Sequence, residues 1–132
     1  MRLCHDKGLY IYPCDGFRSF AAQDALFAKQ NGTTNARGGD SYHNYGLAVD
    51  FAFDKDLNAE GVQWSWSGDH AWDQVAAIAD SLGLKWGGSF KTLKGDLGHY
   101  EKSYGYSVQY LKGVHIKWGL KEVWKKLKES EN

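Results

Sequence analysis

The segment 47–53 restricts the fold of this chain more than any other stretch, because two kinds of side chain alternate along it without a break. Every second position is apolar, namely Leu47, Val49, Phe51 and Phe53. The positions between them hold two alanines and Asp50. This alternation predicts a β-strand with one face against a core. Asp50 lies on the opposite face, and its small neighbours leave room for a ligand or a metal beside the carboxylate.

The rest of the chain predicts a small α+β domain. Residues 9–12 favour an edge strand that stops at Pro13, and further strands are expected at 84–86 and 96–101. Helices are predicted at 20–30 after the N-cap Ser19, at 71–82 after the N-cap Asp69, and at 120–127. Polar, glycine-rich loops are expected at 33–40 and 54–68. Because the chain has 132 residues and domains run to about 100–200, we expect residues 1–132 to form a single α+β domain with two to three packed helices.

Composition excludes several classes of function. Sixteen basic and sixteen acidic side chains give zero formal net charge, whereas nucleic-acid binding normally requires a basic excess. No run reaches the roughly 18 apolar residues of an integral membrane segment, and the first residues lack the apolar core of a signal peptide. We therefore expect a chain made in the cytoplasm without a signal peptide. Cys4 and Cys14 are too few for a disulfide scaffold, and two separate thiols are favoured over a pair.

Three residues have the side chains that zinc takes in hydrolytic sites: His43, Asp50 and His99. Such sites use three protein ligands and leave the fourth position to water. Each residue alone has an ordinary interpretation, since a single histidine is more often a hydrogen-bonded core or surface residue than a ligand. Their combination favours a metal site.

The motifs around these residues resemble those of a known family. Ser41 to Asp50 matches all five fixed positions of Ser-x-His-x-x-Gly-x-Ala-x-Asp. This is the signature of the zinc peptidases that cut peptidoglycan stem peptides, which include D-Ala-D-Ala peptidases and the L-alanyl-D-glutamate endopeptidases of phage endolysins. Asp96-Leu97-Gly98-His99 fits the family's second signature, and Gly16-Phe17-Arg18-Ser19 with Gln23 fits a third. Three motifs in the family's order are matched by chance far less easily than one.

The resemblance implies a role for each residue. One Zn²⁺ would be bound by three ligands, His43, Asp50 and His99. Asp96 would be the general base for the attacking water and then the acid for the leaving amine. Arg18 would stabilise the oxyanion, and Ser41 would contact the substrate or orient the first ligand. The implied fold is that of the Hedgehog/DD-peptidase group, an antiparallel sheet with packed helices.

Ordinary alternatives stay open for single residues. Arg18 could form a surface ion pair, and Asp96 could cap a turn. Oxygen-bearing side chains alternate at Asp54, Asp56 and Asn58, but the segment lacks the glycine and the distant glutamate of an EF-hand, so a solvated turn is favoured over a calcium site. Family members usually carry a helix before the Gly-aromatic-Arg segment, and few residues precede it here, so the chain is either compact or trimmed.

The base position bears on which bond is cut. An aspartate there resembles the L-alanyl-D-glutamate branch and a glutamate the D-Ala-D-Ala branch, so Asp96 favours an endolysin-like endopeptidase. The alternatives are a D-alanyl-D-alanine carboxypeptidase and a non-catalytic zinc-bearing binding or signalling domain. We expect a monomer without a separate wall-binding domain. Its partner would be a peptidoglycan stem peptide, reached after release through a separate membrane lesion.

Overall fold

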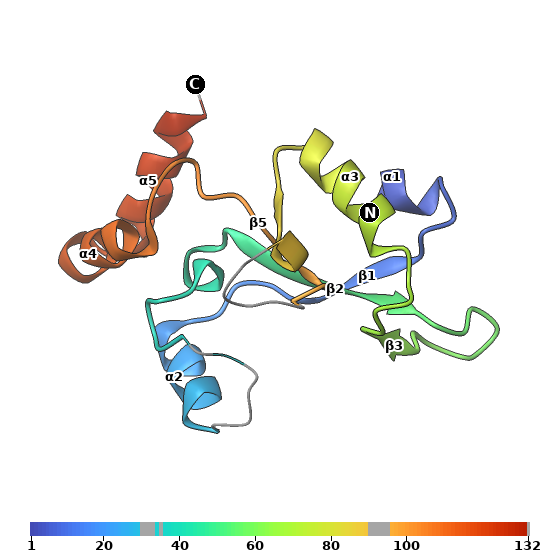
Figure 1. Ribbon diagram of the computed structural model, residues 1–132. Helices are drawn as coiled ribbons and strands as arrows, with labels where there is room; N and C mark the ends of the chain where they lie inside the picture. Colours follow the sequence, from blue (N-terminus) through green and yellow to red (C-terminus); the bar gives the residue numbers. More distant parts are fainter. Residues whose placement is uncertain (30–33, 35, 90–95, 132) are drawn as a thin grey trace. The chain divides into compact units, whose positions relative to one another are not determined.

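The computed structural model describes residues 1–29, 34, 36–89 and 96–131. The chain divides into two compact units. One comprises Met1–Gly16 and Val49–Lys102, and the other Phe17–Ala48 and Ser103–Asn132. Helices and a sheet are both present (Figure 1), which confirms the predicted α+β class. That residues 1–132 act as a single domain stays a prediction.

The first unit is built on a mainly antiparallel sheet (Figure 1). Its strands are β1 (Ile11–Asp15), β2 (Ala48–Asp54), β3 (Trp64–Ser65), β4 (Lys85–Trp86) and β5 (His99–Glu101). They follow the order β1-β2-β5-β4, and β3 pairs with β2. The β1–β2, β2–β3 and β4–β5 pairs are antiparallel. β2 is the strand predicted from the alternating segment, and the strand order places Asp50 and His99 on neighbouring strands.

Two helices pack with this sheet, α1 (Arg2–His5) and α3 (Trp72–Ser81). Their shared core consists of Cys4, Leu9, Ile11, Phe53, Trp72, Val75, Ala79 and Tyr100. α3 buries Trp72, Val75 and Ala79, which lie at helical spacing, whereas Leu82 lies beyond the helix and is 54% exposed. Burial of each large apolar side chain contributes about 1.5–3 kcal/mol, so this core holds the sheet in place.

The predicted end of the first strand is wrong. β1 continues through Pro13 to Asp15, with a register shift between these two residues. Proline is tolerated here because β1 is an edge strand, where a missing N–H need not break a ladder hydrogen bond. The continuation brings Asp15 opposite Asp50 in the β1–β2 register.

The predicted cap of α3 is also wrong. The N-cap residue is Ala71, without a side-chain cap hydrogen bond. Asp69 instead accepts a hydrogen bond from the Ser67 hydroxyl. Two residues within the predicted 54–68 loop form β3, which a pattern of only two residues could not indicate.

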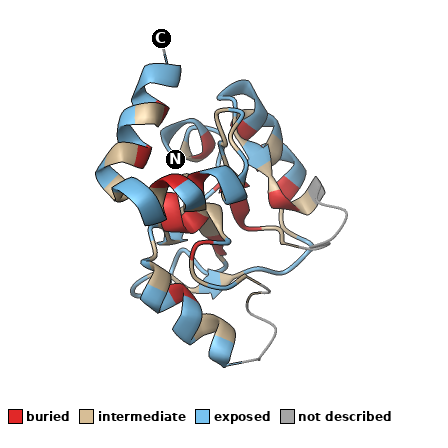
Figure 2. Ribbon diagram, turned by 90° about the vertical axis from the view of Figure 1, so that its left-hand side faces the viewer, coloured by how far each residue is buried: buried red, intermediate tan, exposed pale blue. Residues whose placement is uncertain are grey.

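The second unit is helical. It contains α2 (Phe20–Ala28), the 3₁₀-helix η1 (Tyr42–Tyr45), α4 (Val108–Trp118) and α5 (Leu120–Ser130). Its core residues are Tyr45, Leu111, Val114, Val123 and Leu127. Figure 2 shows buried positions on one side of the helices and exposed positions on the other. α5 was predicted and α4 was not, so the described chain has more helices than the expected two to three.

The helix α2 begins as predicted, because the Ser19 hydroxyl accepts a hydrogen bond from Ala22 N at 3.0 Å. The residue that α2 buries is the polar Gln23, not one of its apolar side chains. The predicted end of this helix, at residue 30, lies outside the described residues. Cys4 is buried and Cys14 exposed, and both thiols are free, as the sequence favoured.

The Asp54–Asn58 segment is a polar turn. The Asp54 carboxylate accepts hydrogen bonds from the backbone N–H groups of Asp56 and Gln63, and the Asp56 carboxylate accepts one from Asn58. These bonds support the solvated turn that the sequence favoured. No helix in the described part of the chain is long and apolar enough to cross a membrane.

Candidate metal centre

Asp50 projects from β2, the strand with the strongest sequence signal. Its side chain is 25% exposed, and its neighbours Ala48 and Ala52 are buried. The Cys14 thiol donates a hydrogen bond to the Asp50 backbone carbonyl at 3.4 Å. The sheet therefore fixes the backbone of Asp50 and leaves its carboxylate partly accessible.

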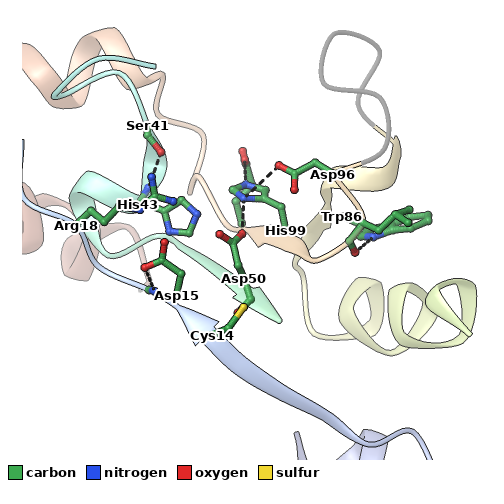
Figure 3. Close-up of polar contacts among 12 residues, drawn as sticks. Cys14, Asp15, Arg18, Ser41, His43, Asp50, Trp86, Asp96 and His99 are labelled. Atoms are coloured by element: carbon green, nitrogen blue, oxygen red, sulfur yellow. Dashed lines mark hydrogen bonds and ion pairs between the residues drawn. The ribbon is translucent and has the colours of Figure 1, made fainter. Parts of the chain in front are cut away.

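His99 begins β5 and lies among the carboxylates of Asp50, Asp96 and Glu101. Figure 3 shows the first two beside the imidazole. Its Nδ1 is 3.1 Å from Asp50 Oδ1 and 3.9 Å from Asp96 Oδ2. Its Nε2 is 2.8 Å from Glu101 Oε1. The His99 side chain is only 11% exposed, so both ring nitrogens are held in a sheltered, negatively charged environment.

This environment changes the protonation of His99. Burial lowers its pKa, but the hydrogen bonds with Asp50 and Glu101, together with the charges of Asp50 and Asp96, outweigh burial and raise the pKa to about 9. The metal-free protein therefore favours an imidazolium at neutral pH. A cation that binds at Nδ1 replaces a proton and supplies positive charge to the same carboxylates.

Two glycines allow the backbone to approach His99 closely. A Cβ at Gly98 would lie 2.3 Å from the Phe51 carbonyl oxygen, and one at Gly87 would lie 2.8 Å from His99 Cβ. Gly87 opens the short 3₁₀-helix η2 (Gly87–Ser89). Phe51 N donates to Gly98 O at 2.8 Å. Glycine is thus required where β2 meets the segment that leads into β5, next to two candidate ligands.

His43 lies in η1, whose ends are well defined. The Ser41 hydroxyl accepts a hydrogen bond from His43 N at 3.2 Å, and Asn44 Oδ1 accepts one from Ser41 N at 3.1 Å. Gly46 ends η1 with a φ of 73°, a conformation that costs other residues about 1–2 kcal/mol. Ser41 therefore shapes the backbone of the first candidate ligand, and contact with a substrate stays a prediction.

Arg18 is anchored next to η1. Its backbone N donates to His43 O at 3.0 Å, and its carbonyl accepts from Asn44 Nδ2 at 3.0 Å. Its Nη1 donates to Gln23 Oε1 at 2.8 Å. Gln23 is fully buried and donates in turn to the Ala36 carbonyl at 2.9 Å. Gln23 thus orients the guanidinium of Arg18, and the role of Arg18 toward an oxyanion stays a prediction.

Asp96 is the most exposed of the carboxylates around His99, at 44%. Its backbone carbonyl accepts a hydrogen bond from His99 N at 3.3 Å, so it also belongs to the turn that the sequence offered as an alternative. The turn uses the backbone of Asp96, and its carboxylate lies near His99 with Oδ2 3.9 Å from Nδ1. Its part as a general base stays a prediction.

The donor set of His43, Asp50 and His99 fits zinc. Each side chain offers one ligand atom, and these atoms lie within 4.8 Å of one another. Two ligands bound to one tetrahedral zinc at about 2.0–2.2 Å are roughly 3.3–3.6 Å apart, and His99 Nδ1 and Asp50 Oδ1 are 3.1 Å apart. Two imidazoles and a carboxylate are also ligands that catalytic zinc takes. These residues could therefore hold the predicted ion.

A comparison with protein families identifies the chain's relatives. Residues 34–102 match the family described as D-alanyl-D-alanine carboxypeptidase, a stretch slightly longer than half of the chain and one that contains all three candidate ligands. The chain belongs to this family. Membership confirms the resemblance drawn from the three motifs, and the family description by itself does not decide which bond this protein cuts.

One curated relative of this chain is CwlK of Bacillus subtilis, a peptidoglycan L-alanyl-D-glutamate endopeptidase. It is 44% identical over 108 residues, which cover 73% of this chain and 62% of CwlK. The chain therefore spans less than two thirds of that relative's length.

Solved structures share the fold. The L-Ala D-Glu endopeptidase ChiX of Serratia marcescens matches with a TM-score of 0.53 and 27% identity, over 73% of this chain and 68% of ChiX. The vancomycin-resistance D,D-pentapeptidase VanY, solved as a variant in complex with Zn(II), matches with a TM-score of 0.52 and 17% identity, over 93% of this chain and 76% of VanY. The second likeness concerns the fold alone. Together they confirm the predicted small α+β fold with an antiparallel sheet and several helices.

Two residues of this region were not assigned roles from the sequence. Glu101 contacts His99, and Gln23, noted only as part of a motif, anchors Arg18. The signal for Glu101 was its position two residues after His99 on a strand, because alternate residues share a face. Gln23 has no comparable signal, since a polar residue in a short helix is normally expected at the surface.

Proposed function

We propose that this protein is a zinc-dependent peptidase that cleaves the L-alanyl-D-glutamate bond of peptidoglycan stem peptides. The observation that carries the proposal is the group of His43, Asp50 and His99, whose ligand atoms lie within 4.8 Å of one another, beside the exposed carboxylate of Asp96. The 44% identity to an L-alanyl-D-glutamate endopeptidase supports the choice of bond. We also propose that the protein acts at the cell wall as a monomer.

The chain's own residues supply the proton transfers. Bound zinc would polarise the scissile carbonyl and lower the pKa of a water molecule toward about 7. Asp96 takes a proton from the attacking water as its oxygen bonds to the carbonyl carbon. The same carboxyl group then gives that proton to the amine nitrogen as the C–N bond breaks. Arg18, held by Gln23, stabilises the negative charge that develops on the carbonyl oxygen.

The test is digestion of purified peptidoglycan followed by mass spectrometry of the products. A new amino terminus on D-glutamate is the expected result, with about one zinc per chain and loss of activity in a chelator that added Zn²⁺ reverses. Release of free D-alanine would instead identify a D-alanyl-D-alanine carboxypeptidase. Zinc binding without either product would overturn the proposed activity in favour of a non-catalytic zinc domain.

A further inference from the structure

Glu101 lies where it can act on His99 directly. The two residues are separated by one position on β5, so their side chains lie on the same face of the strand. Glu101 Oε1 is 2.8 Å from His99 Nε2, and the two side chains are only 13% and 11% exposed. A sheltered carboxylate is costly to bury without a partner, so this close contact is a defined interaction.

The contact separates the roles of the two ring nitrogens. Nε2 is taken by Glu101, whereas Nδ1 is 3.1 Å from Asp50 Oδ1, which belongs to another candidate ligand. A histidine that binds a metal through one nitrogen commonly donates its other N–H to a carboxylate, which fixes the tautomer and the ring orientation. Of the two nitrogens, Nδ1 is therefore the one available to a cation.

We propose that Glu101 is a positioning residue that holds His99 with Nε2 protonated and Nδ1 directed to the metal. This inference rests on the zinc site of the proposed function. It adds a residue that acts through His99 without contacting the substrate or the metal. Because the carboxylate accepts the Nε2 hydrogen, rotation of the ring that would present the wrong nitrogen breaks a charge-assisted hydrogen bond.

A competing explanation is that Glu101 serves the sheet alone. In the register of β4 and β5, Glu101 lies opposite Lys85, and an opposite-charge pair across two strands stabilises a sheet modestly. Under that explanation, loss of Glu101 and loss of Lys85 would have similar effects on stability. Neither loss would then change the affinity for zinc.

The experiment compares the wild-type chain with four variants, E101A, E101Q, K85Q and the exposed-surface control E129A. Zinc affinity is measured by competition with a chromophoric chelator, and thermal unfolding is measured for the metal-free forms. We expect E101A to lose about 10–100-fold in zinc affinity, as when such carboxylate partners are removed. E101Q should lose less zinc affinity, because its amide oxygen still accepts a hydrogen bond from Nε2. K85Q and E129A should bind zinc with the affinity of wild type.

Nitrogen-15 NMR of the imidazole groups in the zinc-loaded protein supplies a readout that stability alone does not move. We expect a slowly exchanging proton on His99 Nε2 in wild type and E101Q, and its loss by exchange in E101A. Equal zinc affinity and an unchanged His99 spectrum in E101A would overturn the proposal. If wild type itself bound no zinc, the proposed function would fail, which is a different outcome from wild-type binding that is insensitive to Glu101.

Discussion

The three carboxylates around His99 differ in their access to solvent, and this difference separates their tasks. Glu101 is 13% exposed, Asp50 25% and Asp96 44%. Glu101 contacts Nε2 of His99, and Asp50 lies near Nδ1 of the same ring. Asp96 Oδ2 is 3.9 Å from Nδ1. A sheltered carboxylate is suited to holding a ligand, whereas an accessible one can exchange protons with water and substrate. This difference supports the proposal that Asp96 carries the proton transfer.

Replacement of Asp96 by asparagine should separate binding from turnover. We expect D96N to keep its zinc and to lose about 10²–10⁴ in kcat, because the amide cannot take a proton from the water. The measurements are zinc content by atomic emission and steady-state cleavage of a muropeptide. D80N alters an exposed aspartate of α3 and is the matched control. Full activity in D96N would contradict the assigned role.

Replacement of Tyr100 by phenylalanine should not destabilise the protein at neutral pH. Tyr100 is 1% exposed, and within the described part of the chain its phenol oxygen has no hydrogen-bond partner. A buried unpaired hydroxyl costs free energy, so we expect Y100F to unfold with a free energy equal to wild type or about 1 kcal/mol higher. Urea unfolding at pH 7 measures this difference, and a clear loss of stability would contradict the explanation.

The same variant makes a prediction at alkaline pH. Burial raises the pKa of Tyr100, and the nearby Cys4 thiolate charge raises it further. Above the unfolded-state pKa of about 10, the unfolded chain loses its phenol proton while the folded chain keeps it. The free energy of unfolding is therefore unaffected below that pH and falls as the pH rises above it. Y100F should therefore lose less stability than wild type between pH 10 and 11. Some loss should remain, because burial also raises the pKa of Tyr45; an unchanged slope would count against this explanation.

At the scale of elements, the meeting of β2 with the start of β5 depends on Gly98. Its missing side chain would overlap the Phe51 carbonyl oxygen at 2.3 Å, which is backbone and cannot move aside cheaply. We expect G98A to lower the free energy of unfolding by about 1–3 kcal/mol and to weaken zinc binding, because His99 is the next residue. The measurements are urea unfolding and chelator competition.

The control for G98A is Gly113→Ala in α4. A Cβ there meets nothing within 4 Å, and alanine favours a helix over glycine by about 1 kcal/mol. G113A should therefore be at least as stable as wild type and bind zinc equally well. If G98A behaved like G113A, the close approach at Gly98 would not matter for the site.

The elements that could be predicted were those with long periodic patterns. β2 follows from alternation over seven residues and α5 from apolar residues at helical spacing. β3 consists of two residues, too short for any period to be visible. α4 was missed although Ser107 caps it, because Gly113 and His115 interrupt its apolar face. The sequence predicts that the first strand stops at Pro13, because the edge position that permits proline depends on the tertiary fold.

The candidate ligands could be found from the sequence because motif spacing records them, whereas their supporting residues could not. His43, Asp50 and His99 occur in signatures with fixed spacings. Glu101 and Gln23 act through contacts at 2.8 Å that depend on strand register and helix burial. Short-range sequence patterns do not contain strand register or helix burial, so these contacts are visible only in the folded chain.

At the scale of the whole molecule, metal binding and folding should be coupled. The three candidate ligands occupy positions 43, 50 and 99, so an unfolded chain does not hold them together. A ligand that binds only the folded chain stabilises it by about 2.7 kcal/mol when its free concentration is 100 times its Kd. We therefore expect chelation of zinc to lower the Tm by several degrees and readdition to restore it.

The variant that tests this coupling is D50A, which removes one ligand without enlarging a side chain. Its Tm should respond little to zinc or to a chelator, because two imidazoles alone bind the ion far more weakly. D80A supplies the matched control, and its response should equal that of wild type. Differential scanning calorimetry at a fixed protein concentration measures all three. A wild-type Tm that does not depend on zinc, with zinc shown to be bound, would mean that the ion binds the unfolded chain equally well, and the proposed ligand set would then be wrong.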